Sequence, residues 1–161
     1  MVENFEIWAE ATQWGAFARS SQWVWATAET IHFIGLSLLI GMVGLFDLRL
    51  MGMAKAIPVA ALHRLIPVGI AGYAVNVITG SLFLFGYPDQ YLTNRAFQFK
   101  MVFMALAGMN IVLFYTTAFR KANAVGAGAD APMQIKLIAG ASFFLWLGVL
   151  VCGRLLTFYR P

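Results

Sequence analysis

Four long apolar segments dominate the pattern of hydrophobic and polar positions along this chain of 161 residues. They cover about residues 23–46, 58–86, 95–119 and 133–158, and shorter polar or Gly/Ala-rich stretches separate them. At a rise of about 1.5 Å per residue, an α-helix of this length crosses a hydrocarbon core about 30 Å thick. The pattern therefore predicts an all-α integral membrane protein whose four spans form one helical bundle.

The first 22 residues have a different pattern, in which aromatic and charged side chains are mixed. Phe5 and Trp8 share one face at helical spacing, whereas the glutamates fall elsewhere. We interpret this segment as a short amphipathic helix at the membrane surface, with its tryptophans in the headgroup layer. The predicted organisation is an interfacial segment over residues 1–22 and a four-span bundle over residues 23–161.

Several residues next to the apolar segments predict where the helices begin or bend. Ser20 and Ser21 offer a cap for the first span, and Asn94 offers one for the third. Pro67 lies inside the second span and removes a backbone donor there. We therefore expect a kink in the second span at this proline.

The composition agrees with a membrane protein, because 61% of the residues are hydrophobic and only 11% are charged. A soluble domain carries about 25% charged residues. The basic residues are spread over loops and helix ends, so membrane orientation explains them better than nucleic-acid binding. The single Cys152 excludes an intrachain disulfide and a multi-cysteine zinc site.

Charge is distributed unequally between the two ends of the predicted bundle. Both termini and the loop at 87–94 share one end, and the loops at 49–57 and 120–134 share the other. The second end carries the basic residues Arg49, Lys55, Arg64, Arg120, Lys121 and Lys136 against the acidic residues Asp47 and Asp130. The first end carries Arg19, Arg95 and Arg160 against Glu3, Glu6, Glu10 and Asp89. The positive-inside rule then places the second end in the cytoplasm and both termini outside.

Four ionisable side chains are predicted to lie at a similar depth inside the bundle: Glu29, His32, Lys100 and Arg154. Glu29 and His32 are three residues apart, so they lie on one side of their helix. The first and third spans run in the same direction, which brings Lys100 near the level of His32. Arg154 is near the end of the fourth span, which returns to the same side. A charged group inside the membrane costs at least about 3 kcal/mol, so it is rarely left unpaired.

Two interpretations of this cluster are open. In the first, the groups form a structural polar knot that neutralises itself and fixes the packing of the helices. In the second, which we favour, His32 binds a haem or a metal ion while Lys100 and Arg154 hold carboxylates of the cofactor. Gly35, one turn after His32 on the same face, would then clear space for a flat cofactor. The alternative role of such glycines is close packing between helices.

The second histidine, His63, is not expected to bind the same haem as His32. The two residues enter the membrane from opposite sides, and their predicted levels differ by about 10 Å. The sixth position of a haem on His32 is therefore expected to be open, or to be filled by Lys100 or Met104.

Near the cytoplasmic end, Asp47 is predicted to form an ion pair with Arg49 or Arg64. At the membrane boundary such a pair would anchor the helix ends.

Copper is the alternative ligand for this cluster. Imidazole and thioether groups are the donors that Cu(I) prefers, and His32, Met101 and Met104 fall near one level. Most of the eight methionines are nevertheless expected to fill the apolar core.

The order of these features resembles two groups of small bacterial four-helix membrane proteins. His32 lies in IHFIGLSLLIGMVGLFDLRLMG, the second span reads LHRLIPVGIAGYAVNVITGSLFLFG, and Lys100 lies in AFQFKMVFMALAGMN. This layout is similar to the haem-b-containing HemJ-type protoporphyrinogen oxidases and to the membrane domain of the copper-resistance D family. It also fits an uncharacterised relative of both groups. In the HemJ-type proteins a histidine early in the first span and a lysine early in the third are the functional pair, and His32 and Lys100 match those positions.

The resemblance implies a protein that binds haem b, although Glu29, Arg154 and the N-terminal segment depart from the oxidase pattern. Together with the cluster, it leads us to expect axial ligation by His32, which Glu29 would tune. The expected role is electron transfer between quinone or an outer donor and a partner. The chain would act in a bacterial inner membrane with periplasmic termini, as a subunit of a larger complex rather than a stand-alone enzyme. Expected partners are membrane lipid, quinone and membrane or periplasmic redox subunits, but not nucleic acid; the alternatives are a copper-handling protein or a structural subunit.

Overall fold

The computed structural model describes residues 2–158, with side chains described from residue 4 onward. Its elements, in chain order, are α1 (Val2–Ala11), α2 (Gln13–Arg19), α3 (Gln22–Leu50), α4 (Val59–His63), α5 (Ile66–Gly86), α6 (Pro88–Leu92), α7 (Arg95–Leu113), the π-helical turn η1 (Phe114–Ala118), α8 (Phe119–Asn123) and α9 (Met133–Leu155). This part of the chain contains no β-strand, so the predicted all-α class is confirmed.

Four helical segments are long and apolar enough to cross a membrane: Gln22–Leu50, Val59–Gly86, Arg95–Asn123 and Met133–Leu155. Their outward side chains are apolar, as Ile34, Met109 and Phe144 illustrate with exposed fractions of 57%, 67% and 64%. Exposed apolar surface on this scale is not typical of a soluble monomer and suits contact with lipid. These features indicate a multi-pass membrane protein built as a four-helix bundle.

The second span differs from its prediction. The helix breaks at residues 64–65, and Pro67 lies in the first turn of α5. A proline in the first turn removes an N–H that has no helical partner in any case. The expected kink at Pro67 is therefore wrong, because this proline belongs to the start of a new helix.

Two predicted helix caps are confirmed. The Ser21 hydroxyl accepts a hydrogen bond from the backbone N–H of Trp23 at 3.2 Å. The side-chain oxygen of Asn94 accepts one from the backbone N–H of Ala96 at 2.9 Å. Each cap pairs a donor that a helix end leaves free, which fixes where the first and third spans begin.

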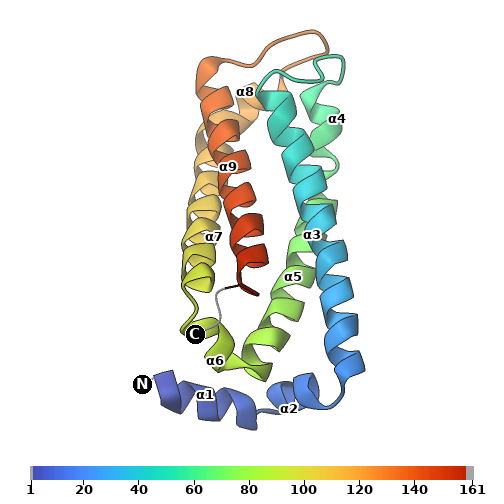
Figure 1. Cartoon of the computed structure of the whole chain (residues 1–161). Coiled ribbons are helices and arrows are strands. Elements are labelled where there is room, and N and C mark those ends of the chain that lie inside the picture. Colours follow the sequence, from blue (N-terminus) through green and yellow to red (C-terminus); the bar gives the residue numbers. More distant parts are fainter. Residues whose placement is uncertain (1, 159–161) are drawn as a thin grey trace.

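The bundle consists of two helix pairs that close on one side only (Figure 1). α3 packs along α5, α7 packs along α9, and the pairs are joined through α3 and α9, whereas α5 and α7 scarcely touch. Gly35 and Gly72 let α3 and α5 approach closely, since a Cβ built on Gly72 would lie 2.5 Å from the Gly35 carbonyl oxygen. Because α5 and α7 scarcely touch, the bundle is open on the side between these two helices.

α1 and α2 lie across one end of the bundle, where α6 and the end of α9 also lie (Figure 1). The Arg19 guanidinium fixes them by donating to the carbonyl oxygens of Gly86 at 2.9 Å and Glu10 at 2.6 Å. Trp8 and Trp14 remain 57% and 40% exposed. α1 and α2 thus cover this end of the bundle with two exposed tryptophans.

Two charges that the sequence assigns to this end are not covered by the structure. The side chain of Glu3 and the whole of Arg160 lie outside the described residues.

At the opposite end, no ion pair joins Asp47 to Arg49 or Arg64 among the described residues, so the expected ion pair is wrong. The Arg49 side chain is fully buried and donates to carbonyl oxygens of both loops, Ile57 at 2.5 Å, Gly126 at 3.0 Å and Ala129 at 3.2 Å. Loop carbonyls have no ladder partner, and a guanidinium offers five donors to satisfy several of them. Arg49 therefore ties the two loops together.

Asp130 also connects the loops, through ion pairs with Lys136 at 2.7 Å and Lys55 at 3.3 Å. The hydrogen bond from Lys136, aided by Lys55, holds the pKa of Asp130 below its ordinary value. The unfolded carboxyl binds a proton more readily, so this stabilisation is complete above about pH 4 and is lost as the pH falls through the folded pKa.

We expect the stability of Asp130→Asn to decrease less than that of the unchanged protein when the pH is lowered from about 5 to about 3. The difference is small, because the ion pairs are exposed and screened. Unfolding temperatures of both proteins across this range, measured in one detergent, check the prediction. Identical acid sensitivity would contradict it.

Candidate functional site

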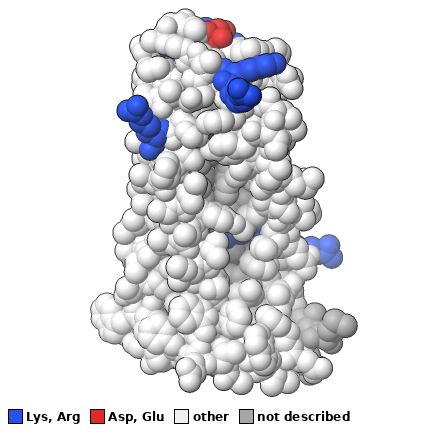
Figure 2. Space-filling model, turned by 180° about the vertical axis from the view of Figure 1, so that it is seen from behind, with Lys and Arg blue, Asp and Glu red and all other residues white. Residues whose placement is uncertain are grey.

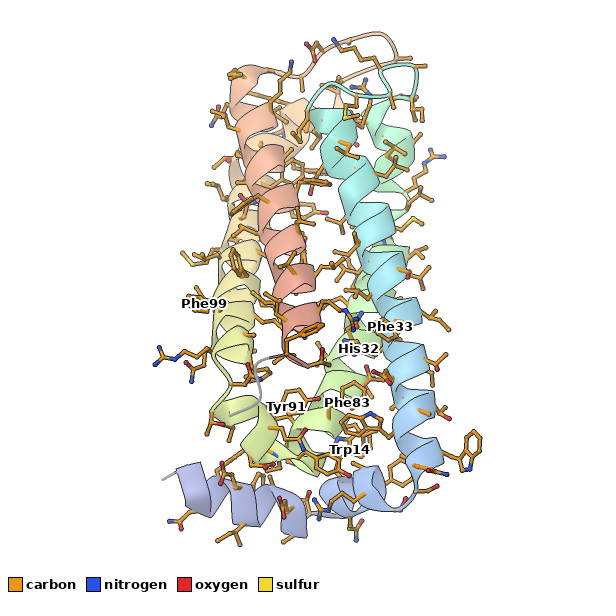
Figure 3. All side chains as sticks on the ribbon, viewed as in Figure 1. Trp14, His32, Phe33, Phe83, Tyr91 and Phe99 are labelled. Carbon is orange, nitrogen blue, oxygen red and sulfur yellow. The ribbon has the colours of Figure 1, made fainter. Side chains whose placement is uncertain are left out.

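His32 lies on α3, and its ring points into the bundle toward α5 (Figure 3). Its Nδ1 atom is 2.7 Å from the hydroxyl oxygen of Thr79, and its ring centroid is 5.5 Å from that of Phe83. A Cβ built on Gly80 would lie 3.8 Å from the Cε1 atom of His32, an ordinary van der Waals distance, so α5 packs against the ring at this position. One polar partner and apolar neighbours on α5 therefore fix the orientation of the imidazole.

The hydrogen bonds of Thr79 determine which nitrogen of His32 carries the proton. The Thr79 hydroxyl has one hydrogen, which it donates to the carbonyl oxygen of Val75 at 2.7 Å. When this hydrogen is given to Val75, the Thr79 oxygen accepts from Nδ1–H of His32. The second ring nitrogen, Nε2, keeps its lone pair and has no hydrogen-bond partner among residues 4–158. This is the form of histidine that binds metals, with the tautomer set by a hydrogen bond on the other nitrogen.

Lys100 on α7 is the charged residue that acts on His32. Its charge acts electrostatically on the His32 ring, and a Cβ built on Gly153 of α9 would lie 3.9 Å from its Nζ atom. The ammonium forms no ion pair with the described residues. The structure thus brings His32 and Lys100 into one region of the interior, and Figure 2 shows basic atoms deep in the hollow of the opposite face.

The other two members of the predicted cluster lie elsewhere. Arg154 is exposed, with its guanidinium carbon 5.5 Å from the ring centroid of Phe158. Glu29 is also exposed and makes no hydrogen bond to His32. Burial, together with the negative charge of Glu29, raises the pKa of Tyr91 in α6 to about 12. The closed four-group knot is therefore not formed, because Glu29 and Arg154 are exposed and neither makes an ion pair with a described residue.

Gly35 and Met104, which were expected near a cofactor, both pack against neighbouring helices. A Cβ built on Gly35 would lie 2.8 Å from the carbonyl oxygen of Gly72, so α5 fills the space that a cofactor was expected to use. Met104 packs in a cluster with Leu39 and Trp146. The observed role of Gly35 is close helix packing.

His63 lies far from His32. It donates to or accepts from the Tyr115 hydroxyl through Nε2 at 3.1 Å, and its ring is 5.8 Å from that of Phe46. Phe46 lies 14 residues after His32 on the same helix, which corresponds to about 21 Å along its axis. This placement agrees with excluding the two histidines as ligands of one haem.

A cavity of about 220 Å³ lies between the spans and is bounded by all four of them. Its walls include Val43, Tyr73, Met104, Gly108, Asn110 and Trp146. A smaller cavity of about 40 Å³ lies on the other side of Trp146, beside Asp47. His32 lines neither of them.

Sequence reasoning missed two features of this interior. Thr79, which orients His32, is a polar residue within the second span at the depth of the histidine. Asn110 is a polar residue in the middle of the third span and lines the large cavity. Their signal was present, since an amide or a hydroxyl inside a span requires a partner.

Comparisons of the chain with protein-family models, with curated proteins and with solved structures give no match. Among the described residues, no three His, Cys, Asp or Glu side chains gather into a metal-binding group. The arguments for function therefore rest on the residues and on the geometry of the chain.

Thr79→Val is expected to release the His32 ring from its fixed tautomer, since valine has the same shape but no hydroxyl. Thr79→Ser keeps the hydroxyl and is the matched control. Nitrogen NMR of histidine-labelled protein distinguishes Nδ1–H from Nε2–H. The unchanged protein and the serine variant should show Nδ1–H for His32, whereas the valine variant should show a mixture. An unchanged spectrum in the valine variant would contradict the assigned hydrogen bond.

Proposed function

We propose that this chain is a haem-b-binding protein of a bacterial inner membrane. It transfers electrons between quinone or an outer donor and a partner, as the small subunit of a larger complex. The observation that carries the proposal is the His32–Thr79 hydrogen bond. It leaves Nε2 of a membrane-embedded imidazole unprotonated and without a partner among the described residues.

The residues around His32 suit the group that this function requires. Neutral imidazole is a common axial ligand of haem iron, and its hydrogen-bonded second nitrogen sets its orientation and its basicity. Lys100 adds an interior cation without an ion pair to described residues, which suits a propionate. Phe83 and the other apolar neighbours supply a dry surrounding for a flat ring.

Haem b supplies the one-electron chemistry, and the protein supplies ligation, burial and charge. Thr79 holds the His32 ring so that Nε2 is presented, and burial between the spans keeps water from it. Lys100 offsets negative charge in its vicinity. Arg154 is exposed beside Phe158 and makes no ion pair with a described residue, so it remains a second candidate for a propionate.

The distribution of charge supports the proposed orientation. The loops tied by Arg49 and Asp130 belong to the end that is rich in lysine and arginine, which Figure 2 shows at the top of the molecule. The positive-inside rule assigns this end to the cytoplasm and the end with α1, α2 and α6 to the periplasm. His32 would then be nearer the periplasmic side, within reach of an outer electron donor.

Titration of the detergent-purified chain with haemin tests the binding directly. We expect the Soret absorbance to grow and saturate at one haem per chain. Empty micelles of the same detergent, which take up haemin without saturation, are the control. A chain that behaves like the empty micelles while remaining folded by circular dichroism would overturn the proposal and leave the structural role.

A further inference from the structure

The large cavity opens sideways, toward lipid rather than toward water. α5 and α7 scarcely touch, and the residues at the edges of the gap, Ile70 and Ile111, are 60% and 41% exposed. Figure 2 shows the hollow at mid-height of this face, with uncharged surface around its rim and basic atoms deep inside it. A molecule that enters here must therefore come from the hydrocarbon phase.

Asn110 gives the cavity a polar contact at the middle of the membrane. One N–H of its amide donates to the carbonyl oxygen of Ile138 at 3.2 Å, which fixes the orientation of the amide. The amide has a second N–H and an oxygen with two lone pairs, and neither makes a hydrogen bond to a described residue. In hydrocarbon these groups have no water to bind, so a ligand that pairs with them gains free energy.

The remaining walls suit a flat ring. The rings of Tyr73 and Trp146 meet edge to face, with centroids 5.9 Å apart, and both line the cavity. Gly108 adds open space, because a Cβ built there would meet no atom within 4 Å. An aromatic wall, an open glycine and one two-sided amide favour a ring that carries oxygen over a plain acyl chain.

We propose that the cavity between α5 and α7 binds the ring of a lipid-soluble quinone, with one ring oxygen on the Asn110 amide. The amide serves both oxidation states, since its free N–H donates to a quinone carbonyl and its oxygen accepts from a quinol hydroxyl. The site deepens the quinone part of the proposed function. Its occupancy does not require haem, because none of its contacts involve His32.

Nuclear magnetic resonance of the full chain, labelled with ¹⁵N at the tryptophan indoles, reads out the site. Trp146 is one of five tryptophans, and its signal is identified by its loss in Trp146→Phe. Decylubiquinone is titrated into the protein in nanodiscs, and decane is titrated in parallel. We expect the Trp146 signal to shift in a saturable way with the quinone and not with decane, while the Trp23 signal stays in place.

Two glycine variants make the test specific. Gly108→Leu puts a side chain on the cavity wall at a position where a Cβ meets no atom within 4 Å, and it should weaken quinone binding by at least about tenfold. Gly41→Leu is its match, since Gly41 is also in a span and also has open space around it, but it does not line the cavity. Gly41→Leu should bind like the unchanged protein. Asn110→Leu should weaken binding by about fivefold to tenfold through the lost hydrogen bond.

Three results would overturn the proposal. The first is a Trp146 signal that does not move at saturating quinone. The second is equal binding by Gly108→Leu and Gly41→Leu, and the third is the same shift with decane, which would identify an acyl chain as the occupant. All three are read without any haem signal, so failure of the haem proposal is seen separately in the haemin titration.

Discussion

Replacing Arg49 by alanine is expected to lower the free energy of unfolding by about 3 kcal/mol or more. The side chain is fully buried, and its guanidinium donates to main-chain oxygens of both loops at the end opposite α1 and α2. Alanine would remove the donor of these part-buried hydrogen bonds and would open a cavity the size of the side chain. Unfolding by dodecyl sulfate in mixed micelles, followed by circular dichroism, measures the loss.

Arg49→Lys separates charge from geometry. Lysine keeps the positive charge but not the planar fork, so we expect an intermediate loss. Arg120→Ala is the control, because Arg120 is exposed at the same end. Its stability should stay within about 0.5 kcal/mol of the unchanged protein. If Arg49→Ala behaved like this control, Arg49 would not be the connection between the loops.

Replacing His32 by alanine is expected to lower the affinity for haem by more than about a hundredfold. The variant lacks the nitrogen proposed to bind the iron, whereas loss of the orienting hydroxyl in Thr79→Val should cost about tenfold. Affinities come from haemin titration of each purified variant. Added imidazole should restore part of the binding to His32→Ala, because it replaces the missing ligand in the space left behind.

His63→Ala is the matched control for this prediction. His63 interacts with Tyr115 at the other end of the spans, so its loss should leave haem affinity unchanged. Loss of binding in His63→Ala and retention in His32→Ala would reverse the assignment. Equal retention in both variants would show that haem partitions without a histidine ligand.

The fold could be predicted almost completely from the sequence because the apolar segments are long and well separated. Ser21 and Asn94 cap the spans as expected. Pro67 was misjudged because a proline inside an apolar run has the same local pattern whether it kinks a helix or begins one. The break at residues 64–65 depends on how α4 packs against α3 and α8, which no local pattern encodes.

The site could be predicted only in part. Depth along a helix follows from counting residues, so His32 and Lys100 were placed in one region correctly. The direction in which a side chain faces depends on the rotation of each helix, and for that reason Glu29 and Arg154 were expected inside. Arg49 was expected to pair with the Asp47 carboxylate. It binds loop carbonyl oxygens instead, and these come together only through tertiary structure. Thr79 was missed because its partner is 47 residues away in sequence.

Binding of haem b by His32 is tested by the absorption spectrum of the freshly purified protein, recorded oxidised and then reduced with dithionite. We expect a Soret band and, on reduction, sharp α and β bands of b-type haem, all of which are lost in His32→Ala. A folded protein without visible absorbance, which also fails to take up haemin, would contradict it.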